Sequence, residues 1–446
     1  MITAWPRPRR LVLVRFLLCL LVFSAVSGCW NDSVPCADCN VVLISMDTLR
    51  ADHVGAYGYG RPTTPNIDAF AAQSVVFERA VSQSAWTRPA HASMFTGLYP
   101  SEHGIVGISG EPAIPRELPL LAEVLANGGY RTVGLVGGGN VDARFGFGRG
   151  FERYEQDGRR FEDHMDAALM VLRDPDRRPF FLFLHGFDAH KPYKSRPEDR
   201  RSLGLAGERA RGMERICAEG ARPDRLAPHV DEYDAAIHRG DRSLGRLFEQ
   251  LGAVGNGRPT VVIFTSDHGE EFGEHGGCWH IRSLHREIVE VPLVVLIPGF
   301  SPLRVDGPIP ASVSIAPTIL DVVGVRGRPL PGPSLLPQLM GHSSPGLPVI
   351  SQTESRLLDR SGGELWALTS HDEKLLEWST LGRRELYNLT TDPGEHESEH
   401  EGPDVERAGR QVAHWRALHG PVAPPRHLGR LPIDLKRQLK RLGYAE

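Results

Sequence analysis

The chain has 446 residues, of which 41% are hydrophobic and 24% charged, and its formal net charge is −4. This composition is typical of a globular protein and excludes collagen-like, coiled-coil and largely disordered chains. Because the charge is mildly negative, the chain lacks the broad basic surface that nucleic-acid binding requires, so we expect no nucleic-acid partner.

The first 28 residues have the pattern of a secretory signal. Four arginines precede an apolar run at 16–26: Arg7, Arg9, Arg10 and Arg15. The run is too short to span a bilayer comfortably, and small residues follow it and lead directly to Cys29. This ending resembles the bacterial lipoprotein signal, which predicts lipidation of Cys29 and a membrane-anchored protein outside the cytoplasm, in the periplasm or at the cell surface. A plain cleaved signal and an N-terminal anchor helix are the alternatives.

The cysteines fit an oxidising compartment. The chain has six of them: Cys19, Cys29, Cys36, Cys39, Cys217 and Cys278. Cys19 lies in the signal and Cys29 would carry lipid, which leaves an even number. For Cys36 and Cys39 we expect a local disulfide or two unpaired thiols, because no second pair lies near enough to form a zinc site. Cys217 and Cys278 could also pair.

Strands and helices alternate along the sequence after the signal. Short runs of β-branched and aromatic residues predict strands at 40–45, 131–136, 179–185, 260–266 and 292–297. Helical spacing begins at 65 and recurs at 118–128 and 233–251. This alternation predicts an α/β fold with a mostly parallel central sheet covered by helices on both faces.

The second half of the chain contains two departures from this alternation. Residues 194–229 are rich in Arg, Glu, Gly and Pro, which predicts a mobile insertion. Beyond about residue 345, short strand-like pieces predict a small antiparallel subdomain. The predicted domains are a signal peptide (1–28), a tether (29–39), a main domain (40–345), a small C-terminal subdomain (346–400) and a peripheral tail (401–446).

Polar residues follow three of the predicted strands. They are Asp47 after the first strand, His185, Asp188 and His190 after the third, and Asp267 with His268 after the fourth. Ligands of open α/β sheets bind beyond the carboxyl ends of the strands, so these side chains should meet at one edge. Carboxylates and an imidazole suit a divalent cation, and we predict Asp47, Asp267 and His268 as its ligands. Singly, each would fit a helix cap or a turn.

Thr87 lies just ahead of a predicted helix, in the segment SAWTRPAHASMFTG at 84–97. Pro89 suits the first turn of that helix, whose free amides would attract an anion. A sulfuryl or phosphoryl group could therefore rest against Thr87. Threonine is also a good helix cap, and this segment alone is consistent with both roles.

Seven segments together resemble the sulfatase branch of the alkaline-phosphatase superfamily. In family order, over roughly 40–395, they are SMDTLRADHVGAYGY, TTPNIDAFA, WTRPAHASMFTGLYPSEHG, HGFDAHKPY, SDHGEEFGEHG, EVPLVVLIPG and ELYNLTTDPGE. The resemblance implies an alkaline-phosphatase-like catalytic domain over 40–345 with a small second subdomain. It implies metal ligation by Asp47, Asp267 and His268, with Thr87 at the nucleophile position. It further implies that three histidines contact substrate or transfer protons: His185, His190 and His280.

The chain departs from the sulfatase pattern at two places. Sulfatases carry a Cys or Ser that becomes formylglycine, with an Arg four residues later, where this chain has Thr87 and His91. Oxidation of threonine would give a ketone rather than an aldehyde, so the formylglycine route is closed. The family also usually has two adjacent acids after the first strand, where this chain has Asp47 and Thr48. The Thr87 oxygen could complete the metal site, as in the phosphoethanolamine and lipoteichoic-acid transferases of the superfamily.

These observations predict a metal-dependent hydrolase of phosphate, phosphonate or, less favourably, sulfate esters. Thr87 attacks, while the helix near Pro89 and His91 stabilise the equatorial oxygens. One of His185, His190 and His280 protonates the leaving oxygen. The alternatives are a phospho-group transferase, a formylglycine-independent sulfuric ester hydrolase and a non-catalytic binding protein.

The expected cofactor is one divalent ion, which could be Ca, Mg, Mn or Zn. A second ion could bind at Asp188, His190 and His280. The expected partners are a small-molecule, glycan or lipid ester as substrate, and the membrane through the lipid anchor.

Overall fold

The fold is taken from a computed structural model, which describes residues 34–107, 111–206, 208–343, 346–354, 363–424, 426–428 and 431–442. The predicted signal peptide and the lipidation site Cys29 lie outside these residues. From Cys36 onward the described residues belong to one compact unit.

The central sheet is mostly parallel. It contains eight strands: β1 (Asn40–Met46), β2 (Val75–Val81), β4 (Arg131–Leu135), β5 (Arg153–Glu155), β6 (Phe180–Gly186), β7 (Thr260–Thr265), β10 (Glu290–Leu296) and β11 (Leu303–Pro310). They lie in the order β11-β2-β10-β7-β1-β6-β4-β5. Within this sheet β10 runs antiparallel to both of its neighbours, and the other pairs are parallel. The α/β class predicted from the sequence is therefore confirmed.

The strands that the sequence did not predict lie toward the two edges of the sheet. The predicted runs became β1, β4, β6, β7 and β10, whereas β2, β5 and β11 were missed. In β2 and β11, exposed charged residues such as Glu78, Arg304 and Asp306 interrupt the apolar pattern. A half-exposed strand has no continuous hydrophobic run, so periodicity indicates it only weakly.

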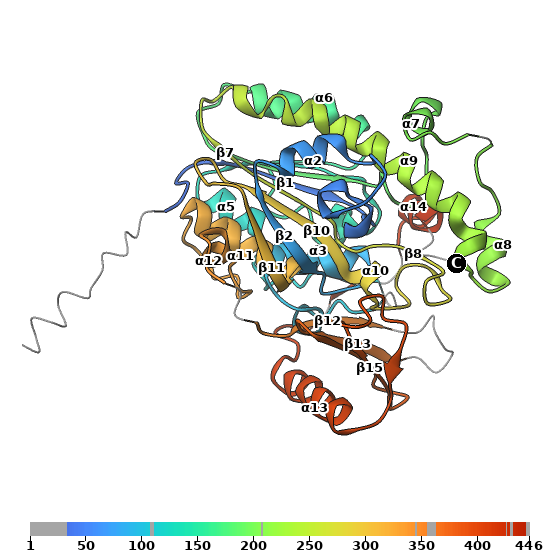
Figure 1. Ribbon diagram of the computed structural model, residues 1–446. Helices are drawn as coiled ribbons and strands as arrows, with labels where there is room; N and C mark the ends of the chain where they lie inside the picture. Colours follow the sequence, from blue (N-terminus) through green and yellow to red (C-terminus); the bar gives the residue numbers. More distant parts are fainter. Residues whose placement is uncertain are drawn as a thin grey trace, which may run out of the picture. The chain divides into compact units, whose positions relative to one another are not determined.

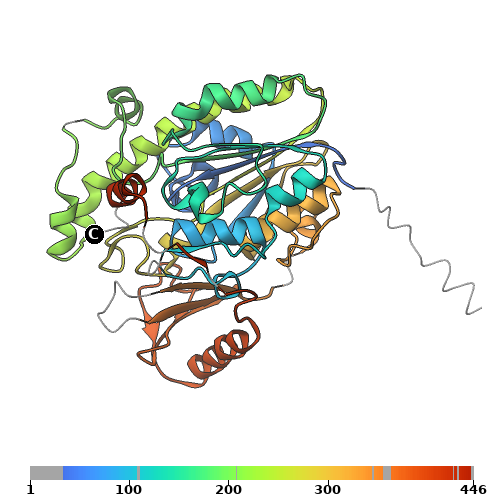
Figure 2. The ribbon, with the colours of Figure 1, turned by 180° about the vertical axis from the view of Figure 1, so that it is seen from behind.

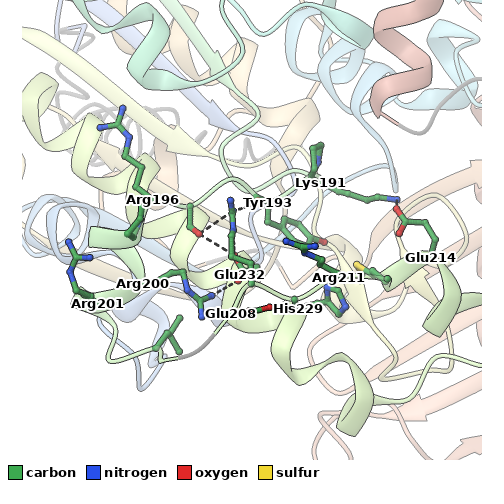
Figure 3. Close-up of a pocket in the computed structure, with 18 residues that line it drawn as sticks. Lys191, Tyr193, Arg196, Arg200, Arg201, Glu208, Arg211, Glu214, His229 and Glu232 are labelled. Carbon is green, nitrogen blue, oxygen red and sulfur yellow. Dashed lines mark hydrogen bonds and ion pairs between the residues drawn. The ribbon is translucent and has the colours of Figure 1, made fainter.

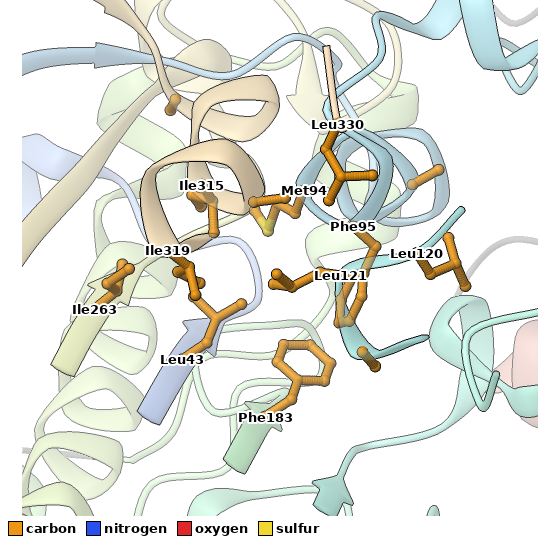
Figure 4. Packing of buried hydrophobic residues seen from close by; sticks show 14 of the residues in the cluster. Leu43, Met94, Phe95, Leu120, Leu121, Phe183, Ile263, Ile315, Ile319 and Leu330 are labelled. Atoms are coloured by element: carbon orange, nitrogen blue, oxygen red, sulfur yellow. The ribbon is translucent and has the colours of Figure 1, made fainter. Parts of the chain in front are cut away.

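Helices cover both faces of the central sheet (Figure 1 and Figure 2). One face holds α2 (Pro65–Ala71), α6 (Phe161–Arg173) and α9 (Pro223–Phe248), and the other holds α3 (Thr87–Thr96), α5 (Leu121–Asn127) and α11 (Ala311–Val323). Successive residues of β1 alternate between them: Ile44 packs with the first group and Leu43 with the second. Figure 4 shows the second core, in which Leu43 and Phe183 face Phe95 and Ile319.

A second sheet follows the central one in the sequence. It is antiparallel throughout and contains β12 (Val349–Glu354), β13 (Glu364–Thr369), β14 (Glu373–Trp378), β15 (Arg383–Asn388) and β16 (Ser398–Glu399). The helix α13 (Pro403–Leu418) packs on one face of it. The other face packs against side chains of the main domain, among them Val81 and Leu284. This sheet confirms the C-terminal antiparallel element of the predicted fold.

The structure also assigns helices to the predicted mobile insertion and to the predicted peripheral tail. The stretch 194–229 contains α7 (Pro197–Ser202), α8 (Met213–Ala218) and the first turns of α9. Near the C-terminus, α14 (Ile433–Leu442) buries Leu435 and Leu439 in the main core. Two disulfides are formed, Cys36–Cys39 and Cys217–Cys278. Among the described residues, no helix combines the length and apolar character that crossing a bilayer requires.

Candidate active site

The polar residues at the strand ends meet at one edge of the central sheet. Strands β7, β1 and β6 are neighbours in that order. Their carboxyl ends therefore bring together four side chains: Asp267 and His268, Asp47, and His185. All four are fully buried. The edge thus concentrates charged and titratable groups in a place from which water is largely excluded.

Asp47, Asp267 and His268 form a corner that fits a divalent metal. Each offers one ligand atom, and these atoms lie within 4.8 Å of one another. Asp47 Oδ1 and Asp267 Oδ2 are buried and accept no hydrogen bond from the described residues. A buried carboxylate oxygen without a donor is costly unless a cation compensates its charge. The three residues therefore match the donor set of a divalent ion.

The electrostatics of the two carboxyl groups support the same conclusion. Burial and the neighbouring Asp267 raise the pKa of Asp47 well above its usual value. Burial acts in the same direction on Asp267, but the rings of His268 and His91 outweigh it and lower the pKa of Asp267. Two adjacent buried acids resist simultaneous ionisation, and a bound cation would relieve this repulsion.

The hydroxyl of Thr87 points into this corner. Thr87 is the first residue of α3, and the helix cap position belongs to Trp86. Thr87 Oγ1 lies 3.2 Å from Asp47 Oδ2 and 3.4 Å from His268 Nε2. The sequence left two roles open for Thr87, a helix cap and a contact with the substrate. The geometry favours the second role, because the hydroxyl faces the corner rather than capping α3.

His91 lies behind Thr87. Its Nδ1 is 2.9 Å from the carbonyl oxygen of Thr87, and its Nε2 is 3.1 Å from Ser45 Oγ. Burial lowers the pKa of His91 to about 4, so the ring is neutral at pH 7. Both ring nitrogens have protein partners. This arrangement suits a group that positions Thr87 better than the contact with ester oxygens that the sequence predicted.

The other three predicted histidines occupy different positions around the corner. His185 lies beside the metal corner, with Nε2 3.2 Å from Asp47 Oδ2 and its Nδ1 accepting from the Gly137 amide. The His280 ring centroid is 4.5 Å from that of His268 and 5.3 Å from that of His190. The ring of His280 thus lies between the ring of His268, in the metal corner, and the ring of His190.

Asp188 is directed toward a helix rather than toward the histidines. Its Oδ2 accepts a hydrogen bond from the backbone amide of Phe161, the first residue of α6. Burial raises its pKa to about 7. Asp188 does not belong to either group of three His, Cys, Asp or Glu residues in the described chain that could hold an ion. The predicted second metal site at Asp188, His190 and His280 thus gains no support from this geometry.

Sequence reasoning missed Glu270, which is fully buried behind His280. Glu270 Oε1 is 2.9 Å from His280 Nδ1, and its Oε2 accepts a hydrogen bond from the Tyr193 hydroxyl. A carboxylate on one ring nitrogen orients a histidine and stabilises its protonated form. The motif SDHGEEFGEHG contains three glutamates besides Asp267, and nothing in the sequence distinguishes Glu270 from the other two.

Strained backbone flanks the same histidine. Trp279 and Ile281, on either side of His280, have φ values of 67° and 82°. Thr48, next to Asp47, has φ 62°, and its amide nitrogen lies 3.3 Å from Asp267 Oδ1. Left-handed backbone at residues other than glycine is costly and clusters at functional sites. The strain here lies beside both the metal corner and the candidate proton-transfer residue.

The chain matches known proteins of one family. The sulfatase family model matches residues 39–325. A Delta 4,5-hexuronate-2-O-sulfatase of Bacteroides thetaiotaomicron is 24% identical over 430 residues, covering 85% of this chain and 87% of that protein. The human N-sulphoglucosamine sulphohydrolase is 30% identical over 325 residues, covering 64% of this chain and 63% of that protein. The solved structure of a phosphonate monoester hydrolase of Agrobacterium radiobacter superposes with a TM-score of 0.65 at 21% identity, covering 85% of this chain and 94% of that chain.

Proposed function

The chain belongs to the sulfatase family and is a hydrolase of the sulfatase and alkaline-phosphatase superfamily, and on this premise we propose that it cleaves an anionic ester through Thr87. The observation that carries the proposal is the position of Thr87 Oγ1, 3.2 Å from Asp47 Oδ2 in the corner that fits a metal. The ester is a phosphate or phosphonate, or less favourably a sulfate.

Asp47, Asp267 and His268 would hold one divalent ion, with the Thr87 oxygen completing the set. When bound, such an ion lowers the pKa of the hydroxyl and offsets the negative charge of the ester oxygens. The oxygen donors suit Ca, Mg or Mn, whereas His268 also suits Zn.

The first half of the reaction transfers the phosphoryl group to the enzyme. Thr87 Oγ1 attacks phosphorus, and the bond from phosphorus to the leaving alcohol oxygen breaks. Asp47 Oδ2, which accepts the hydrogen bond of the hydroxyl, is placed to take its proton. The positive end of the α3 dipole, next to Thr87, would favour the negative charge that develops on the ester oxygens.

His280 is better placed than His185 to serve the leaving oxygen. His185 contacts Asp47 through one ring nitrogen and the Gly137 amide through the other. His280 instead has the Glu270 carboxylate behind it. Burial and His268 lower the pKa of His280, whereas a bound anionic ester would act in the opposite direction. His280 then gives a proton to the leaving oxygen. In the second half water attacks phosphorus and gives a proton to His280, the bond from phosphorus to Thr87 Oγ1 breaks, and Asp47 returns the proton to the Thr87 oxygen.

The threonine nucleophile favours phosphorus over sulfur. A formylglycine hydrate releases sulfate by collapsing to its aldehyde, and a sulfated threonine has no such route. A phosphothreonine can be released by attack of water at phosphorus. The named relatives act on sulfated hexuronate and sulphoglucosamine, so a sulfate ester of a glycan is the second candidate.

The test is a hydrolysis screen of purified protein on aryl phosphate, phosphodiester, phosphonate and sulfate esters, together with analysis of bound metal. We expect Thr87→Ala to lose at least about 10³-fold in kcat while it keeps its fold, because the attacking atom is gone. Thr87→Ser keeps the hydroxyl and should retain measurable turnover. Activity of Thr87→Ala equal to wild type would overturn the mechanism.

A transferase that passes the phospho-group to an acceptor alcohol shares the first half of this reaction. Product analysis with and without added glycerol separates it from the hydrolase, because a transferase would form glycerol phosphate. A non-catalytic binding protein would turn over none of the four esters.

We further propose, from residues 1–29 alone, that the protein is a lipoprotein held at a membrane outside the cytoplasm. Cys29→Ala should shift the protein from the membrane fraction to the soluble fraction of cells. A variant that stays with the membrane would contradict lipidation at Cys29.

A further inference from the structure

A large cavity lies beside the candidate site and is not used by the mechanism above. Its volume is about 780 Å³, and it is lined by side chains of the 191–214 segment and of α9 (Figure 3). Most of this segment belongs to the stretch 194–229, which is rich in Arg, Glu, Gly and Pro. A cavity of this size accommodates a ligand of a few sugar rings or a comparable molecule.

The wall of the cavity is positively charged although the whole chain is not. Six of its lining residues are Lys or Arg and three are Glu, whereas the chain as a whole has a net charge of −4. Glu232 is shared between Arg200 and Arg209, and Lys191 pairs with Glu214. Two exposed arginines of the wall form no ion pair with any described residue: Arg201 and Arg211. The positive charge is thus local to the cavity wall, and two of its guanidinium groups are available to bind an anion.

The cavity lies next to His280, the candidate proton-transfer residue. Lys191 follows His190 directly, and its ammonium lies 4.1 Å from the ring centre of Trp279, the neighbour of His280. Tyr193, another wall residue, donates to the Glu270 carboxylate that holds His280. His280 is 8% exposed, whereas the residues of the metal corner are fully buried. A substrate therefore reaches the site past His280, on the side where the cavity wall begins.

We propose that this cavity is a binding subsite for a second anionic group of the substrate, a carboxylate, sulfate or phosphate remote from the ester that is cleaved. The proposal rests on the proposed function and makes it more specific, because the natural substrate then carries at least two anionic groups. Guanidinium groups bind carboxylate, sulfate and phosphate oxygens in bidentate fashion. Binding of a remote group also helps to hold the ester against Thr87.

The test measures binding, which does not require turnover. The probe is sucrose octasulfate, a compact polyanion, titrated calorimetrically into the full-length Thr87→Ala protein, with uncharged sucrose as the reference. We expect sucrose octasulfate to bind. Adding the substitutions Arg201→Gln and Arg211→Gln to the Thr87→Ala protein should weaken its affinity for sucrose octasulfate at least tenfold. The matched control pair, Arg116→Gln and Arg410→Gln, removes the same charge at exposed positions outside the cavity lining and should change affinity less than twofold.

The outcomes distinguish this proposal from the proposed function. Equal weakening by the two pairs, or octasulfate affinity no higher than that of sucrose, would overturn the subsite. An affinity unchanged by the cavity pair would place the probe elsewhere and overturn it as well. If no ester is hydrolysed but the cavity pair weakens octasulfate affinity tenfold, the proposed reaction is overturned and the anion-binding cavity is retained. Thermal unfolding midpoints of all variants verify that the fold is kept.

Discussion

Two carboxyl groups are buried side by side at the edge of the central sheet, and each has an oxygen that accepts no hydrogen bond from the part of the chain that the structure describes. Asp47 is disfavoured as an anion by burial and by Asp267, as the raised pKa indicates. A carboxyl group whose pKa is raised on folding destabilises the folded protein at neutral pH unless a cation compensates it. Ionised Asp47 therefore costs stability in the folded protein, and a bound cation would offset that cost.

We predict that Asp47→Asn has opposite effects on metal binding and on stability. Bound metal should fall from about one equivalent toward zero, whereas in the presence of a chelator the variant should be about 1–2 kcal/mol more stable than wild type, because a buried carboxylate next to the Asp267 carboxylate is removed. Elemental analysis and thermal unfolding measure the two effects. Asp188→Asn is the control, since that carboxyl bonds to the α6 amide, and it should keep the metal. Full metal content in Asp47→Asn would contradict the assignment.

We predict that Glu270→Gln changes the pH dependence of the reaction. The carboxylate on His280 Nδ1 stabilises the imidazolium form, so its removal should lower the pKa of His280 and move the corresponding limb of the kcat profile to lower pH. The maximal kcat should fall roughly 10–100-fold, with a smaller change in KM. Glu271→Gln, at the neighbouring glutamate that accepts from the His275 and Gly277 amides, should keep the wild-type profile. A reduced kcat with an unshifted profile would show that Glu270 acts only on the fold.

At the scale of elements, the position of Thr87 depends on how α3 is held. Every residue of this helix is buried, and it packs against α11 and the sheet. Trp86 fixes its beginning by donating from the indole nitrogen to the Val106 carbonyl. Gly97 ends it with φ +69°, where a Cβ would lie 3.0 Å from the Gly332 amide nitrogen. The proposed nucleophile thus stands on a rigid element rather than on a loop, as the required precision of attack demands.

We predict that the two disulfides differ in their contribution to stability. Cys217–Cys278 joins α8 to the strand β9 (Cys278–Trp279) over 61 positions, whereas Cys36–Cys39 spans three. The longer closed loop restricts the unfolded chain more, so the Cys217→Ser and Cys278→Ser pair should cost about 2–4 kcal/mol, and the Cys36→Ser and Cys39→Ser pair about 1–2 kcal/mol. Urea unfolding measures both. The opposite order would mean that chain entropy does not control the effect.

At the scale of the whole described unit, an ionic cluster ties the main domain to the second sheet. His275 Nδ1 is 2.8 Å from Glu287 Oε1, and its Nε2 is 2.8 Å from the carbonyl oxygen of Glu395. Glu395 also forms a buried ion pair with Lys374 of β14. His275, His285 and Glu287 are close enough to hold a metal. Because both nitrogens of His275 already have acceptors, the cluster fits a protonated histidine better than a metal ligand.

We predict that this cluster makes stability fall at alkaline pH. Contacts with Glu287 raise the pKa of His275 to about 9 against the opposing effect of burial. Its contribution, about 2 kcal/mol, should be complete below about pH 6.5 and lost as the pH rises through 9. Urea unfolding from pH 6 to 10 measures it. His275→Gln should be less stable than wild type at pH 6.5 and equal to it near pH 10, and a constant difference across this range would contradict the prediction.

Local sequence patterns specified the α/β class and the buried central strands, and they predicted that Asp47, Asp267 and His268 lie together at one edge of the sheet. These follow from local patterns: apolar runs specify central strands, and polar residues that directly follow parallel strands must share one edge. The family segments added Thr87 and the candidate histidines. None of these inferences required knowledge of how distant loops fold.

Tertiary structure alone decided which side chains meet across long separations in the sequence. It placed Glu270 and Tyr193 behind His280, turned His91 toward Ser45 and directed Asp188 to α6. It also set the direction of β10 and gathered the arginines of the 191–214 segment around one cavity. Hydrogen bonds and charge clusters of this kind depend on side-chain directions in loops, which have no sequence period to indicate them.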